Sequence, residues 1–157
     1  MSVSTDGMVC YGILFEEGYE FPWDDDKYDG DESEWWREVK GYELPFEMYG
    51  ADGEYIGDKG AWTEKQISDY FAHGREWDKE HPLPFQAVNC CSGDYPIYIL
   101  AVPDSYHSAS RGYPQELSLD TTLPVPGLEE LLAFCEQYGL DNESGNEARW
   151  WLCSYWG

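Results

Sequence analysis

The chain has few basic residues. Of its 157 residues only nine are Lys or Arg, against 32 Asp or Glu, and the formal net charge at pH 7 is -23. A protein that binds DNA or RNA needs a basic surface to replace the counterions of the phosphates, and an anionic membrane surface makes the same demand. The composition therefore argues against direct binding to nucleic acid and against attachment to acidic membranes.

Long apolar runs are also missing. The longest extends from Ile97 to Val102, far short of the roughly 18 residues that a membrane-spanning helix needs. Residues 1–7 lack the positive region and the apolar stretch of a signal peptide. We therefore expect a cytoplasmic protein that does not associate with membranes.

Cysteine and histidine lack the spacings of metal sites. An odd number of cysteines, five, without an export signal argues against a disulfide framework, and no Cys-x-x-Cys or His-x-x-x-His pair predicts zinc. The neighbouring pair Cys90 and Cys91 is expected to be a buried part of a strand. The Asp-rich segment before Gly30 resembles a calcium loop, but Lys27 and Trp36 stand at two ligand positions. We expect no metal and no cofactor, with a looser divalent-ion site as an alternative.

Aromatic residues, in contrast, are abundant. Eight Trp, 13 Tyr and six Phe make up 17% of the chain. Disordered acidic segments are poor in aromatics, so this chain can build a packed core. Its length predicts a single domain over residues 1–157. Interspersed strand and helix patterns predict an α+β fold, with an antiparallel or mixed sheet of about five to seven strands packed with about three helices.

Capping signals place the three helices. Asp31 is the expected N-cap of the first, which ends near Lys40, and Thr63 with Gln66 forms a capping box for the second, which ends before two prolines. The third is expected over residues 126–138, with its proline at the first helical position. The expected strands cover residues 9–15, 46–49, 54–56, 85–91, 95–102, about 108–112 and 150–156.

The most distinctive segment extends from Glu16 to Glu34. Ten of its 19 residues are acidic, only Lys27 is basic, and four aromatic residues are interleaved, with two more, Trp35 and Trp36, directly after it. Carboxylates spaced along a rigid surface resemble the phosphates that basic nucleic-acid-binding proteins contact, and exposed aromatic side chains supply contact area. We therefore predict that this segment binds a basic nucleic-acid-binding protein. The predicted partner-binding residues are Glu16, Glu17, Glu20, Trp23, Asp24, Asp25, Asp26, Asp29, Asp31, Glu32, Glu34 and Trp35.

Two alternative functions do not depend on mimicry of phosphates by residues 16–34. The charge could serve solubility alone, in an acidic domain with some other partner. The long irregular segment 103–126 could instead form a pocket for a small molecule or a divalent metal, with Arg111 as an anchor for an anion.

A third alternative is a cysteine-dependent enzyme. Nucleophilic catalysis needs an activated Cys or Ser close to a His. Cys91 with His107, oriented by Asp94 or Asp104, is the one set of this kind that the sequence offers. Because a chain of this length provides such a set by chance, we expect a protein that is not an enzyme.

Four stretches carry a resemblance to other proteins: HPLPF at 81–85, CCSGDYPIYILAVP at 90–103, RGYP at 111–114 and WWLCSYWG at 150–157. They resemble segments of small, acidic, uncharacterised proteins encoded by phages, prophages and gut bacteria. In size and acidity the chain is similar to phage anti-defence proteins, including anti-CRISPR proteins that mimic DNA. It is also similar, by charge and size, to immunity proteins that neutralise nuclease toxins.

The resemblance implies a non-enzymatic inhibitor that blocks the basic surface of a bacterial defence nuclease or CRISPR effector. If the chain is encoded by a phage, it would act in the cytoplasm of the host bacterium. An immunity protein that neutralises a nuclease toxin is the alternative that the same resemblance implies.

Overall fold

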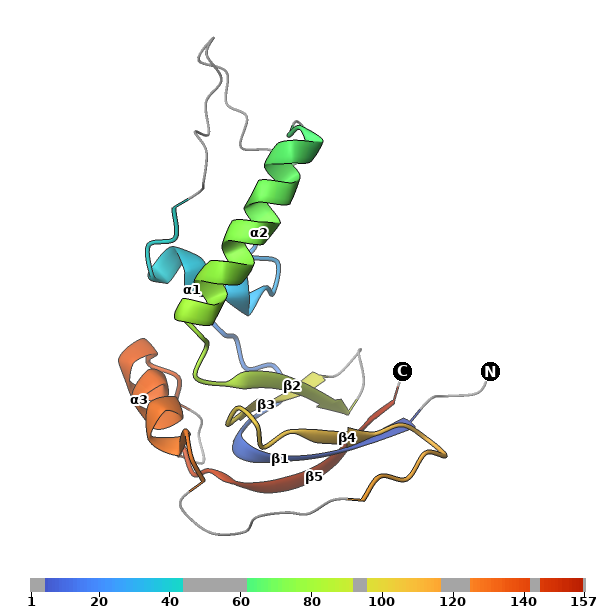
Figure 1. Cartoon of the computed structure of the whole chain (residues 1–157). Helices are drawn as coiled ribbons and strands as arrows, with labels where there is room; N and C mark the ends of the chain where they lie inside the picture. The colour runs from blue at the N-terminus through green and yellow to red at the C-terminus, as the bar shows by residue number, and fades with distance from the viewer. Residues whose placement is uncertain (1–4, 44–61, 92–95, 117–124, 142–144, 157) are drawn as a thin grey trace. The chain divides into compact units, whose positions relative to one another are not determined.

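A computed structural model describes residues 5–43, 62–91, 96–116, 125–141 and 145–156. Over these residues it has three helices and a five-stranded mixed sheet, so the predicted α+β class is confirmed (Figure 1). By its internal contacts the chain divides into two compact units: unit 1 contains residues 1–21 and 84–157, and unit 2 contains residues 22–83. In chain order the elements are β1 (Thr5–Phe15), α1 (Glu32–Val39), α2 (Glu64–Glu80), β2 (Gln86–Cys91), β3 (Pro96–Ala101), β4 (His107–Ala109), α3 (Leu128–Tyr138) and β5 (Arg149–Trp156).

The sheet of unit 1 closes on itself. β1 pairs antiparallel with β5 along one edge and with β3 and β4 along the other, and β3 pairs antiparallel with β2. β2 then meets β5 in one parallel pair, Cys91 opposite Tyr155. The four strands β1, β3, β2 and β5 therefore form a ring of pairings, and the joint between β2 and β5 is its shortest.

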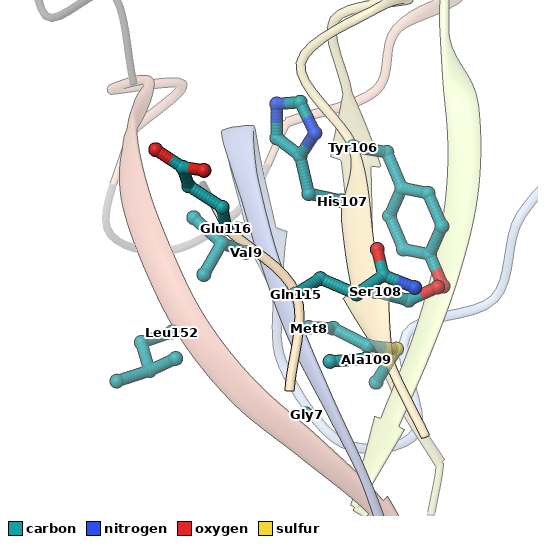
Figure 2. Close-up of a pocket in the computed structure, with 10 residues that line it drawn as sticks. All are labelled: Gly7, Met8, Val9, Tyr106, His107, Ser108, Ala109, Gln115, Glu116 and Leu152. Carbon is teal, nitrogen blue, oxygen red and sulfur yellow. The ribbon is translucent and has the colours of Figure 1, made fainter. Parts of the chain in front are cut away.

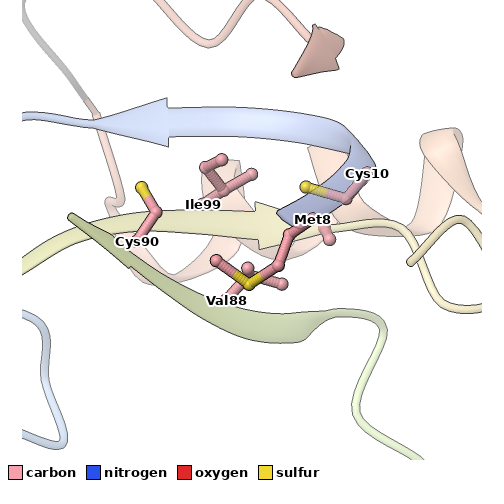
Figure 3. Packing of buried hydrophobic residues seen from close by; sticks show 6 residues of the cluster. Met8, Cys10, Val88, Cys90 and Ile99 are labelled. Atoms are coloured by element: carbon pink, nitrogen blue, oxygen red, sulfur yellow. The ribbon is translucent and has the colours of Figure 1, made fainter. Parts of the chain in front are cut away.

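The inside of this ring is an apolar cluster. Side chains alternate along a strand, so Met8 and Cys10 of β1 point inward while their neighbours Val9 and Tyr11 point outward. The buried members of the cluster come from β1, β2 and β3, and none is more than 5% exposed (Figure 3). They are Met8, Cys10, Val88, Cys90, Ile99 and Ala101.

A second apolar layer covers part of the outward face. Ile13 and Phe15 of β1 point outward and are fully buried, and the ring of Phe15 lies 5.0 Å from that of Phe21. α3 contributes Phe134, whose ring lies 4.9 Å from that of Phe85, just before β2. Burying apolar side chains on both faces explains why the sequence of β1 is almost continuously apolar.

β3 does not continue directly into β4. Ala101 lies opposite Gly12 and His107 opposite Val9, so five residues of the connection face two residues of β1. Ser105 replaces the strand-to-strand hydrogen bonds that are interrupted between β3 and β4. Its buried hydroxyl accepts a hydrogen bond from the Tyr11 N–H at 3.1 Å and donates to the Val102 carbonyl at 2.7 Å.

Unit 2 is built on aromatic packing between its two helices and the preceding turn. The rings of Trp23 and Trp35 lie 5.3 Å apart, and Trp36 Nε1 donates to the His81 carbonyl at 2.8 Å. Arg37 on α1 makes two hydrogen bonds to the Asp78 carboxylate on α2, at 2.9 and 2.5 Å. A partly buried, charge-assisted pair of this geometry fixes the two helices against each other.

Most predicted helix ends agree with the structure. Asp31 caps α1, and Thr63 with Gln66 forms the capping box of α2. The predicted start of the third helix was wrong, because α3 begins at Leu128. Gly127 adopts a left-handed conformation (φ 90°) at its N-cap, so the preceding proline is outside the helix. The predicted strands at 46–49 and 54–56 lie outside the described residues.

Gly12 lies where β1 passes closest to β3. A Cβ atom at this position would collide with the Leu100 carbonyl oxygen and lie 2.7 Å from Ala101 Cα. We predict that Gly12→Ala lowers the free energy of unfolding by about 2–4 kcal/mol, because the two backbones must separate. Gly7→Ala on the same strand is the control: its Cβ would meet nothing within 4 Å. Urea unfolding measures both, and equal stability of the two variants would contradict the close approach.

Candidate functional site

The acidic segment from Glu16 to Glu34 is divided between the two units. Glu16, Glu17 and Glu20 are exposed in unit 1, whereas the carboxylates from Asp24 onward belong to unit 2. By sequence, unit 1 holds 14 acidic and two basic residues, and unit 2 holds 18 and seven. The formal charges are therefore -12 and -11, so each unit is strongly acidic by itself.

In unit 2 the aspartates lie on a hydrogen-bonded turn. The Asp25 carbonyl accepts from the Tyr28 N–H at 2.9 Å, and its carboxylate accepts from the Lys27 N–H, also at 2.9 Å. The Trp23 carbonyl accepts from the Gly30 N–H at 3.1 Å. The backbone that carries the carboxylates is therefore held in one conformation. Asp24, Asp25, Asp26, Asp29 and Asp31 all have exposed side chains.

The first turn of α1 continues this acidic surface. Asp31 Oδ1 accepts from the backbone N–H groups of Ser33 and Glu34, at 2.9 and 3.0 Å. Glu32 and Glu34 follow in the same turn with partly buried side chains. Negative charge at this end of a helix is stabilised by the helix dipole.

Several cations of unit 2 are paired with its own acids. Lys27 binds Glu38 at 2.5 Å, and this contact raises the pKa of Lys27 and lowers that of Glu38. The other ion pairs described in unit 2 are Arg37–Asp78, Lys65–Asp69 and Lys79–Glu76. The one cation within the acidic segment is therefore paired with Glu38, which lies outside that segment.

The aromatic part of the prediction was wrong for four of the six residues. Trp23 and Trp35, both predicted to bind a partner, are only 4% and 5% exposed. Phe21 and Trp36 are buried as well. The two predicted tryptophans pack against each other in the core of unit 2, so they stabilise the fold and do not offer contact area to a partner.

Unit 1 contains a pocket of about 480 Å³ on the outward face of the sheet (Figure 2). Six of its lining residues, from Tyr106 to Ala109 and at Gln115 and Glu116, belong to the irregular segment 103–126. The predicted anchor Arg111 does not line this pocket; its backbone N–H donates to Asp6 Oδ1 at 3.4 Å.

The pocket lies over a row of three side chains that crosses three strands. Val9 is opposite His107 of β4 on one side and opposite Leu152 of β5 on the other. The Leu152 side chain is 83% exposed, which is unusual for a leucine in a sheet. An apolar surface next to the carboxylate of Glu116 and an imidazole suits a ligand with an apolar body and a hydrogen-bond donor or positive charge.

The structure does not bring the predicted nucleophile and base together. Cys91 packs against the cluster inside the ring, whereas His107 lines the pocket on the outward face. Burial raises the pKa of two other thiols, Cys10 and Cys90, to about 12, so both are protonated at neutral pH. One of the two alternative orienting groups, Asp94, lies outside the described residues.

Neither a metal centre nor a membrane span is found in the described part of the chain. No group of three or more His, Cys, Asp or Glu there is arranged to hold a metal ion. No helix there combines the length and the apolar character needed to cross a bilayer. Comparison with protein-family models, curated proteins and solved structures found no match to this chain. The resemblance to phage anti-defence proteins therefore stays a prediction.

The cap of α1 provides a test of how the acidic surface is held. We predict that Asp31→Ala lowers the free energy of unfolding by about 1 kcal/mol, because two backbone N–H groups lose their acceptor. Asp31→Asn removes the same charge but keeps an acceptor oxygen, so its stability should stay within about 0.5 kcal/mol of the parent. Thermal unfolding followed by circular dichroism compares them. If both variants lose equal stability, charge rather than capping is what matters at this position.

Proposed function

We propose that the protein is a non-enzymatic inhibitor that occupies the basic nucleic-acid-binding surface of a bacterial defence nuclease or CRISPR effector. The observation that supports it most directly is the turn from Asp24 to Asp31 and the first turn of α1. Five exposed aspartates are fixed there on a hydrogen-bonded backbone. The one basic residue of the acidic segment, Lys27, is bound to Glu38.

Rigidity matters for this function. A basic channel that binds phosphates is matched by carboxylates at fixed positions, and a prearranged surface loses less conformational entropy on binding. The charge also has a cost, because a net -23 destabilises the compact state through self-repulsion. Solubility alone requires a much smaller net charge.

Burial of the tryptophans changes what the complex should look like. With Trp23 and Trp35 in the core, the carboxylates of this segment contribute mainly by electrostatics. Such contacts speed association and set specificity more than they add affinity, and salt screens them. The complex should therefore form quickly and weaken strongly as the salt concentration rises.

The experiment has two steps. The immobilised protein is first exposed to lysates of bacteria that express CRISPR effectors, defence nucleases or nuclease toxins, at low and at high salt. A target retained at low salt and displaced by its own DNA or RNA supports the proposal. Retention of a nuclease toxin alone would favour the immunity-protein alternative. Retention of no nucleic-acid-binding protein, or of a target that its nucleic acid does not displace, contradicts mimicry.

The second step tests the acidic turn on the captured target. We predict that replacing four aspartates by asparagine lowers the affinity roughly 10- to 100-fold at low salt and flattens the salt dependence. Asparagine at position 25 keeps an acceptor for the Lys27 N–H. The replaced residues are Asp24, Asp25, Asp26 and Asp29.

A charge-matched variant is the control for this experiment. It removes four charges from unit 1, all from exposed side chains: Asp104→Asn, Glu129→Gln, Glu130→Gln and Glu136→Gln. Equal weakening by the two variants would mean that net charge, and not the turn in unit 2, sets the affinity. Surface plasmon resonance gives the rates, and circular dichroism checks that both variants fold.

The pocket supports a second candidate function, the binding of a small molecule by segment 103–126. The outward-facing Leu152 and the volume of about 480 Å³ favour it. Such a volume lies within the range of ligand sites. The carboxylate of Glu116 suits a cationic or neutral ligand better than a phosphorylated one.

We predict that an amine with an apolar body raises the Tm of the parent protein and that Leu152→Ser removes most of that rise. At a ligand concentration about 100-fold above Kd, the rise should be about 5 °C or more. The leucine is exposed, so the substitution itself should change the stability by less than about 0.5 kcal/mol. A panel of amines and of phosphorylated compounds, screened by thermal shift, tests this. No shift with any amine would remove the second candidate.

A further inference from the structure

Three thiols gather at the joint between β2 and β5, which closes the ring of strands. Cys90 and Cys91 are the last two residues of β2. Cys91 lies opposite Tyr155, and Cys153 lies two residues before that tyrosine on β5. Cys91 and Cys153 both pack against the inner cluster to which Cys90 belongs.

The backbone at the end of β2 explains how two consecutive cysteines reach the same interior. Consecutive side chains of a regular strand point to opposite faces. Cys91 has φ 73°, a left-handed conformation that residues other than glycine seldom adopt. The strand is therefore irregular at this residue, and Cys91 packs with Cys153 against the cluster that contains Cys90. The Cys90 Sγ lies 3.2 Å from the Ile97 carbonyl oxygen.

We propose that Cys90 and Cys153 are an oxidisable pair, which a peroxide joins in a disulfide across the β2–β5 joint. Both thiols lie at the inner apolar cluster, and they belong to the two strands that a single residue pair connects. The thiol of the neighbouring Cys91 stays reduced. Nothing in the proposed function requires this bond, so the two proposals are tested separately.

The chemistry has two balanced steps. Hydrogen peroxide first oxidises the Cys153 thiol to a sulfenic acid and is reduced to water. The Cys90 sulfur then attacks the Cys153 sulfur, the S–S bond forms, and the hydroxyl leaves with the Cys90 proton as a second water. Cys153 is partly exposed, whereas Cys90 is 3% exposed. This difference in exposure favours Cys153 as the first thiol to react.

The disulfide would reinforce the shortest joint of the ring. Residues 90 and 153 are 63 positions apart in the sequence, so the bond would remove a large part of the freedom of the unfolded chain. It would also link β2 covalently to β5; in the reduced protein one residue pair, Cys91 and Tyr155, joins these two strands. Oxidation should therefore stabilise unit 1 and slow its unfolding.

The test uses the full chain, treated with hydrogen peroxide at low protein concentration and then with a maleimide under denaturing conditions. We expect an intact mass with three maleimides instead of five, and a Tm higher by about 5 °C or more that dithiothreitol reverses. Cleavage after Lys and Arg gives Cys10, Cys135 and Cys153 on three separate peptides and Cys90 with Cys91 on a fourth. A linked pair of peptides 80–111 and 150–157, with fragmentation that places the bond at Cys90, supports the proposal.

Variants separate the neighbours. Cys91→Ser should keep the linked peptides, whereas Cys90→Ser and Cys153→Ser should lose them. If a serine in the interior prevents folding, the mapping of the parent protein decides by itself. Five maleimides after peroxide treatment, a bond between Cys90 and Cys91, or a bond that joins two chains would each overturn the proposal.

Discussion

β1 pairs with three other strands, and the structure of unit 1 depends on these pairings. β5 lies along one edge, and β3 and β4 follow each other along the opposite edge. The close approach to β3 at Gly12 and the hydroxyl of Ser105 make it possible for one strand to serve both partners. Because residues alternate in direction along β1, one strand contributes to the inner cluster with Met8 and Cys10 and to the pocket with Val9.

Unit 2 solves a different physical problem, because it must hold many like charges on a small fold. Its core consists of packed tryptophans, and the Arg37–Asp78 ion pair joins its two helices. The carboxylates of the turn before α1 are exposed to solvent. The aromatic residues and the acids of the same segment therefore have separate roles. The first build the core, and the second provide the surface on which the proposed function rests.

The proposed acidic surface, the pocket and the thiols lie in distinct parts of the chain. The aspartates are in unit 2, and the pocket and thiols are in unit 1, where Met8 and Tyr106 both line the pocket and belong to or contact the inner cluster. The aspartates can thus be altered without changing the pocket or the thiols. With nine basic residues against 32 acidic ones, most carboxylates of this protein cannot form an ion pair within the chain. The ion pairs described in unit 2, such as Lys27–Glu38, join residues of that same unit.

Local signals in the sequence determined the helix caps at Asp31 and Thr63, the approximate positions of the five described strands and the α+β class, because capping and alternation depend on residues close in the chain. They also located the acidic segment. Only the tertiary structure decided that Trp23 and Trp35 are buried, that Leu152 is exposed, and that Cys90 and Cys153 lie at the same apolar cluster. These outcomes depend on contacts between residues far apart in the sequence, on the strand order and on the closing of the ring between β2 and β5, for which no local pattern carries a signal.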